Sequence, residues 1–93
     1  MNLLTQLFDR LTRDLDPGDP ASADLFELRL HDHWHANLTV MWDLFEERPD
    51  LMRMEVEAEL EVMREILVRL EKEELWEFCA RLRDRLALWS SSC

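Results

Sequence analysis

Three histidines stand at alternate positions of one short segment, His31, His33 and His35. On an α-helix, His31 and His35 lie one turn apart on the same face, and Glu27 lies one turn before them. Two imidazoles and a carboxylate suit a borderline divalent metal such as zinc, so Glu27, His31 and His35 are a candidate metal site. We favour the plainer interpretation, a solvated or partly buried histidine face. A third interpretation is a contact that changes with pH as the histidines gain or lose a proton.

No other residues have the spacing of a catalytic site. Ser22 and the serines at 90–92 lack the Gly-x-Ser-x-Gly turn of a nucleophilic serine, and Cys79 and Cys93 form no Cys-x-x-Cys pair. The chain has one glycine, which excludes a glycine-rich phosphate loop. We therefore expect no enzymatic activity, no cofactor and two reduced thiols.

Tryptophans and clustered glutamates are the candidates for binding another protein. The four tryptophans cannot all point into one small core, and any that remain outside would anchor a partner, because aromatic residues concentrate binding energy at interfaces. Alternating glutamates add a negative surface that would steer the chain toward a basic groove. The candidate partner-binding residues are Trp34, Trp42, Trp76, Glu55, Glu57, Glu59 and Glu61.

The composition describes a small acidic helical chain. Its 93 residues carry 21 acidic and 11 basic side chains, a formal net charge of −10. This negative charge disfavours direct binding to nucleic acid. No apolar run is long enough to span a membrane. The first residues lack the basic region and cleavage site of a secretory signal, so we expect a cytoplasmic protein.

Helix signals divide the chain, treated as one domain over 1–93, into segments 2–15, 20–47, 49–71 and 73–89, followed by a tail at 90–93. Asn2 can cap the first helix, and the turn 16–20 ends it. Asp19-Pro20 and Arg48-Pro49 then mark the starts of the second and third helices.

Two points stay open. Residues 26–44 follow a helical stripe but also alternate as a strand would, and we prefer helix to a hairpin near 35–37. Farther on, the apolar spacing slips by one position near Lys72, so the last helix either breaks there or continues for about 40 residues, nearly 60 Å. The stripe before the slip, which we call the seam, consists of Val56, Leu60, Met63, Leu67 and Leu70.

The predicted fold is therefore all-α, a small antiparallel bundle of three or four helices, with the last one long if it does not break. The function we favour is binding another protein, as a regulator, inhibitor or adaptor whose acidic surface docks on a basic partner. One such partner would belong to a complex that handles nucleic acid. The alternatives are a homodimeric assembly factor or small structural subunit joined through the seam, and a metal-binding protein that uses the histidines.

Overall fold

The computed structural model describes residues 2–91, and within them it contains four α-helices and no strand. They are α1 (Leu3–Thr12), α2 (Pro20–Phe45), α3 (Pro49–Lys72) and α4 (Trp76–Ser91). The predicted all-α bundle is confirmed. The alternation within 26–44 is part of one helix, and the chain breaks after Lys72, so the alternative of a single long helix is wrong.

The helix starts follow the local signals. Asn2 Oδ1 accepts a hydrogen bond of 2.7 Å from the backbone N–H of Thr5, and Asp19 Oδ1 accepts one of 3.0 Å from Ala21. Pro20 occupies the first position of α2, where its missing N–H costs nothing. Pro49 does the same for α3, which has no side-chain cap.

The helix ends differ from the prediction where distant residues intervene. α1 ends at Thr12 and not at Leu15, and α2 ends at Phe45 and not at Glu47. Beyond α1 the guanidinium of Arg29, on α2, donates to the carbonyl of Arg13 at 2.8 Å and to two further carbonyls at 3.3 Å. The guanidinium thereby donates to carbonyl groups that would accept backbone hydrogen bonds if the helix were longer.

The break between α3 and α4 is a Schellman-type turn built without glycine. The N–H of Leu75 donates to the carbonyl of Leu70 at 3.0 Å, and the N–H of Glu74 donates to that of Glu71 at 3.1 Å. Glu74 has a φ of 58°, in the left-handed region that usually selects glycine. α4 therefore starts at Trp76, three residues later than expected.

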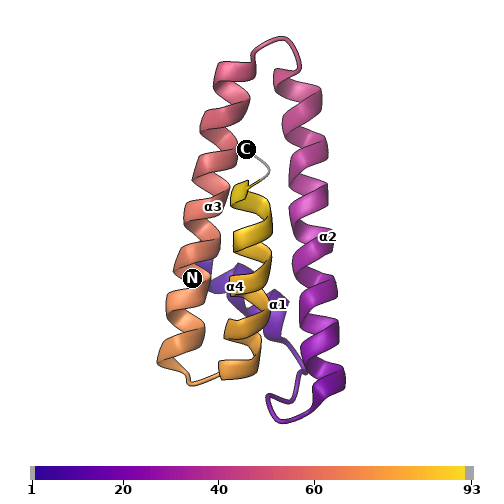
Figure 1. Cartoon of the computed structure of the whole chain (residues 1–93), viewed down its shortest axis with the longest axis vertical. Helices are drawn as coiled ribbons and strands as arrows, with labels where there is room; N and C mark the ends of the chain where they lie inside the picture. Colours follow the sequence, from indigo (N-terminus) through magenta and orange to yellow (C-terminus); the bar gives the residue numbers. More distant parts are fainter. Residues whose placement is uncertain (1, 92–93) are drawn as a thin grey trace.

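α2 and α3 form a long antiparallel hairpin, with α4 packed on one face and α1 on the other (Figure 1). Two stacked ring pairs join α2 to α4. The rings of Phe26 and Phe78 lie 4.7 Å apart at 10°, and those of Trp34 and Trp89 lie 4.3 Å apart at 7°. All four side chains are buried, so these stacks lie at the centre of the core.

The seam residues pack against other helices of the same chain. Leu60, Met63 and Leu70 are at most 2% exposed and belong to the core shared with α2 and α4. In this fold those side chains are covered by the chain's own helices, so a homodimer joined through the seam would first have to displace them.

The helices differ in length, and this leaves part of the hairpin uncovered. At 1.5 Å per residue, the 26 residues of α2 span about 39 Å and the 16 residues of α4 about 24 Å. Figure 1 shows α4 starting beside the far end of α3 and ending well before the α2–α3 turn. About 15 Å of the hairpin therefore extends beyond α4.

Candidate functional site: the uncovered end of the α2–α3 hairpin

The uncovered part comprises about the last two turns of α2, about the first three turns of α3 and the turn between them. We call residues 38–58 the hairpin end. Within it only Met41 is buried, and Met41 lies outside the main core cluster. Four large apolar side chains there are more than half exposed: Val40 at 56%, Trp42 at 57%, Leu44 at 68% and Met54 at 66%. On α2, Val40 and Leu44 share one face, whereas Trp42 stands two positions from each and projects to a nearly opposite face.

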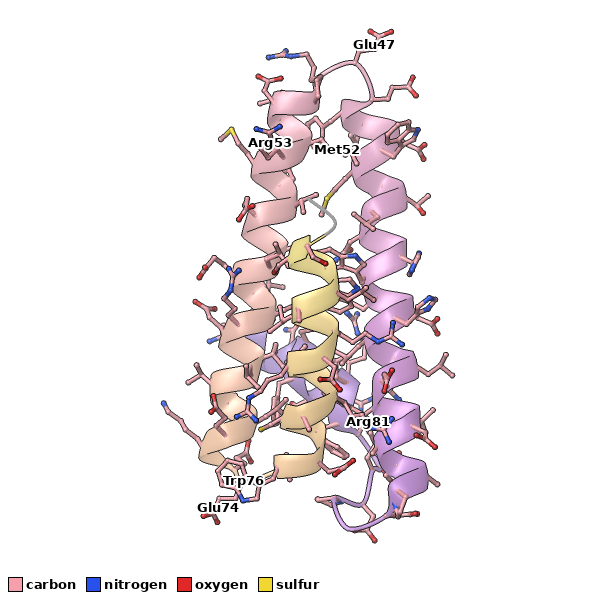
Figure 2. The ribbon with its side chains drawn as sticks, in the orientation of Figure 1. Glu47, Met52, Arg53, Glu74, Trp76 and Arg81 are labelled. Atoms are coloured by element: carbon pink, nitrogen blue, oxygen red, sulfur yellow. The ribbon has the colours of Figure 1, made fainter. Side chains whose placement is uncertain are left out.

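On the face that carries α4, the hairpin end is hollowed. One hollow of about 330 Å³ is lined by Leu38, Thr39, Trp42 and Met52, together with His35. A second, of about 490 Å³, shares His35 and Leu38 with the first and reaches Val56 and the end of α4. Because they share a wall, the two hollows form one groove between α2 and α3 that runs from α4 toward the turn. Figure 2 shows Met52 pointing into the space between the two helices.

Carboxylates surround this apolar surface. The hairpin end carries six acidic side chains and two arginines, a net charge of −4. All eight are exposed, and Arg48 and Asp50 form a loose ion pair of 3.7 Å. The acidic residues are Asp43, Glu46, Glu47, Asp50, Glu55 and Glu57. An exposed apolar surface ringed by negative charge is suited to a partner that brings apolar side chains and cations together.

The structure divides the tryptophans predicted to bind a partner. Trp42 is exposed at the hairpin end, whereas Trp76 is 58% exposed at the opposite end of the molecule (Figure 2), so the two belong to separate surfaces. Trp34 is only 5% exposed and stacks on Trp89. Trp34 is therefore a core residue in this fold, and its burial argues against the prediction that it anchors a partner.

The four predicted glutamates are divided as well. Glu55 and Glu57 are exposed on the hairpin end, and Glu61 is exposed just beyond it, where Arg64 donates to it at 2.8 Å. Glu59 is half-buried and pairs with His33 across 3.7 Å, so its carboxylate faces inward. Glu55 and Glu57 are thus the two that can contribute to a partner surface with Trp42.

The proposed metal ligands are not assembled as a ligand set. The rings of His31 and His35 do lie together, with centroids 4.1 Å apart, but Glu27 turns toward α4. There it accepts hydrogen bonds of 2.8 Å from both Arg81 and Arg85. Over the described range 2–91, no group of three or more His, Cys, Asp and Glu side chains is placed to hold a metal ion.

The Glu27 carboxylate instead ties α2 to α4. The hydrogen bond from Arg81 lowers the pKa of Glu27, partial burial opposes that shift, and the bond from Arg85 lowers the pKa further. The same contact, together with Asp24, raises the pKa of Arg81. Sequence reasoning missed this cluster because its members stand 54 and 58 positions apart in the chain.

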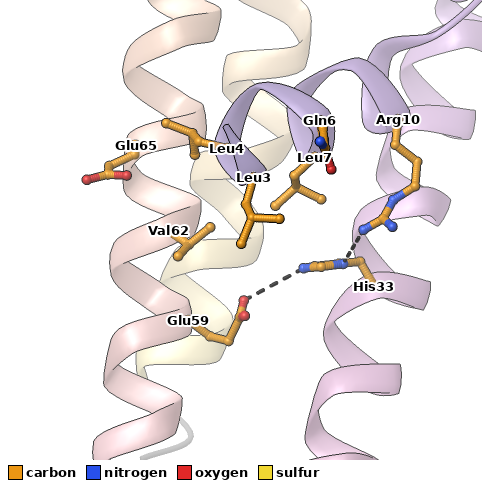
Figure 3. A pocket seen from close by; sticks show the side chains of 9 residues that line it. All are labelled: Leu3, Leu4, Gln6, Leu7, Arg10, His33, Glu59, Val62 and Glu65. Carbon is orange, nitrogen blue, oxygen red and sulfur yellow. Dashed lines mark hydrogen bonds and ion pairs between the residues drawn. The ribbon is translucent and has the colours of Figure 1, made fainter. Parts of the chain in front are cut away.

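A separate hollow, of about 320 Å³, lies where α1 meets the hairpin (Figure 3). At one side Arg10 Nη2 lies 3.2 Å from His33 Nδ1, and His33 Nε2 lies 3.7 Å from Glu59 Oε2. A guanidinium can only donate, so Nδ1 is the acceptor in the contact with Arg10, while Nε2 lies near the Glu59 carboxylate and, at 3.1 Å, near Nδ2 of Asn37. The row Arg10, His33, Glu59 thereby links α1, α2 and α3, which is a structural role.

Comparison with known proteins adds no relative: no family model, no curated protein and no solved structure matches this chain.

None of the helices within residues 2–91 is long and apolar enough to cross a membrane.

Sequence reasoning also missed the groove residues Leu38 and Met52 as binding candidates, and it named Val56 only as part of the homodimer seam. All three fit an apolar stripe, and a stripe indicates packing without showing whether the chain itself supplies the packing partner. The available signal was the difference in length between the second helix and the last one.

Proposed function

We propose that this chain is a cytoplasmic protein-binding module, a regulator, inhibitor or adaptor, that docks through its hairpin end on a basic surface of a larger protein. The observation that supports the proposal is the exposure of Val40, Trp42, Leu44 and Met54 among six carboxylates. Isolated exposed apolar residues are ordinary, but four large ones at one end of a small molecule, with Trp42 beside an open apolar groove, are typical of an interaction site. The cytoplasmic part of the proposal rests on the sequence alone.

The sign of the charge defines the kind of partner. With a net charge of −10, the chain repels phosphate backbones and is attracted to cationic surfaces. A partner that normally holds nucleic acid in a basic groove fits this description. Long-range attraction would raise the rate of encounter, and the apolar contacts would then supply most of the affinity.

The experiment compares two tryptophans of equal exposure at opposite ends. Affinity capture from the native host is carried out with the wild type, with Trp42→Ala and with Trp76→Ala, each at low and high salt. We expect one predominant basic protein with the wild type and with Trp76→Ala, its loss with Trp42→Ala, and weaker capture as salt rises. Equal capture by all three chains, or capture that is indifferent to salt, would contradict the proposal.

Self-association is the second candidate, because the same exposed apolar side chains could cover each other in a homodimeric assembly factor. Two hairpin ends, each with a net charge of −4, would then meet, so the like charges oppose this pairing at low salt. Light scattering separates the two cases. A stable monomer at micromolar concentration favours the heterologous partner, and a dimer that strengthens with salt favours the second copy.

A further inference from the structure

The groove at the hairpin end continues the site that α4 already occupies. Lower on the same face, α4 fills the space between α2 and α3 with Leu82, Leu86 and Trp89, which are all at most 9% exposed. At the end of α4, Leu38 and Val56 line the groove and pack against the core, and beyond α4 its walls are Trp42 from α2 and Met52 from α3. The chain thus has a helix-binding groove that its own helix fills only in part.

The shape of the free groove suits a helix better than an extended segment. About 15 Å of open length accommodates about ten residues of helix, or nearly three turns. The walls are mainly apolar. Their polar side chains are His35 and Thr39 toward the turn, and His31 and Arg85 beside α4. A helix satisfies its own backbone hydrogen bonds, whereas an extended segment would leave backbone groups facing side chains that cannot bond them.

Charge decides between a second copy of the chain and a different partner. Glu46 and Glu57 belong to the acidic ring of the hairpin end, where the net charge is −4. An incoming helix from another copy would bring more carboxylates to that ring. A helix with lysine or arginine beside its apolar stripe would instead place cations next to those carboxylates while its apolar side chains enter the groove.

Resting on the proposed function, we infer that the partner presents a basic amphipathic α-helix of about ten residues, which lies in the α2–α3 groove in line with α4. Apolar side chains at positions i, i+3 or i+4, and i+7 of that helix contact Leu38, Trp42, Met52 and Val56. This arrangement repeats the packing that Leu82, Leu86 and Trp89 of α4 make lower in the groove.

The test uses three synthetic peptides of about 14 residues, long enough to cover the groove. One is a leucine–lysine peptide with its leucines on one helical face, the second has the same composition in shuffled order, and the third replaces lysine with glutamate. Binding to the whole chain is measured by fluorescence anisotropy of labelled peptide. We expect the first peptide to bind best and the glutamate peptide not to bind.

Variants then locate the binding site. Trp42→Ala and Met52→Asp should weaken the leucine–lysine peptide by about tenfold or more, because a central aromatic or apolar contact carries much of the affinity of an interface. Trp76→Ala should leave it unchanged. Far-ultraviolet circular dichroism of each variant confirms that the fold is retained, and Trp42→Ala keeps the test valid if Met52→Asp disturbs the hairpin.

The outcomes separate the inference from the proposed function. Equal binding of the ordered and shuffled peptides, or equal affinity of Trp42→Ala and wild type, would mean that charge alone attracts the peptide, and the helix inference would be overturned. If Trp42→Ala abolishes capture of the natural partner but no peptide binds, the docking function stands and the helical occupant is wrong. If capture of the partner is indifferent to Trp42, the proposed function itself fails.

Discussion

The buried position of Trp34 makes a prediction that separates a core residue from a partner anchor. Trp34 is 5% exposed and stacks on Trp89 with ring centroids 4.3 Å apart. Replacing it by alanine removes that stack and leaves a cavity between α2 and α4. Trp→Ala changes at such sites cost about 3–5 kcal/mol of unfolding free energy.

This loss is large for so small a chain. At roughly 0.05–0.15 kcal/mol per residue, 93 residues give a total stability of about 5–14 kcal/mol. Trp34→Ala should therefore remove at least about a fifth of this stability and lower the Tm by on the order of 15–30 °C. Trp42→Ala is the matched control, since it changes the same residue type eight positions later in α2, where the side chain is 57% exposed. It should cost less than about 1 kcal/mol.

Urea unfolding followed by far-ultraviolet circular dichroism measures both variants, with the m-value checked for constancy. Trp34→Phe should fall between Trp34→Ala and the wild type, because a smaller ring still stacks on Trp89. A Trp34→Ala variant within about 1 kcal/mol of the wild type would refute the core assignment. So would a Trp42→Ala variant that loses as much stability as Trp34→Ala.

Three further predictions concern single contacts. The arginine partners of Glu27 lower the pKa of its carboxyl group, so the ion pairs should stabilise the fold above about pH 4.5 and stop doing so as the pH falls below that value. Glu27→Gln should therefore lower the Tm at neutral pH and make the Tm decline less steeply between pH 5 and 3. Glu74 has a φ of 58°, so Glu74→Gly should raise the free energy of unfolding by about 0.5–1 kcal/mol, whereas Glu73→Gly, at a φ of −93°, should lower it. Urea unfolding measures both variants. If both are less stable than the wild type, the left-handed backbone at Glu74 is not strained. Burial raises the pKa of the Cys79 thiol, so in a Cys93→Ser background an aromatic disulfide reagent should react only after denaturant is added, and rapid reaction with the native chain would show that the thiol is accessible.

The starts of the first three helices could be predicted well from the sequence because they depend on neighbouring residues. Asp19-Pro20 begins α2, Pro49 begins α3, and Asn2 caps α1, each through contacts within a few positions. A cap or an N-terminal proline acts through its own backbone surroundings, so its effect is visible in a short stretch of sequence.

Helix ends were harder because their causes are distant or atypical. α1 stops where Arg29 reaches its carbonyls from α2, a contact that depends on the packing of the two helices. α3 stops at a left-handed Glu74, where the expected glycine is absent. Composition alone therefore left open whether the chain breaks at this point, and the hydrogen bonds of the turn decide it.

The sequence by itself determined the helical class, the apolar stripes and the acidic surface, since these follow from residue propensities, periodicity and charge. Tertiary structure decided which stripe positions are covered. It paired Trp34 with Trp89, turned Glu27 toward two arginines of α4, and left Trp42 outside because α4 is shorter than α2. Periodicity assigns a side chain to a face of its helix, but only the length and placement of the neighbouring helices determine what lies against that face.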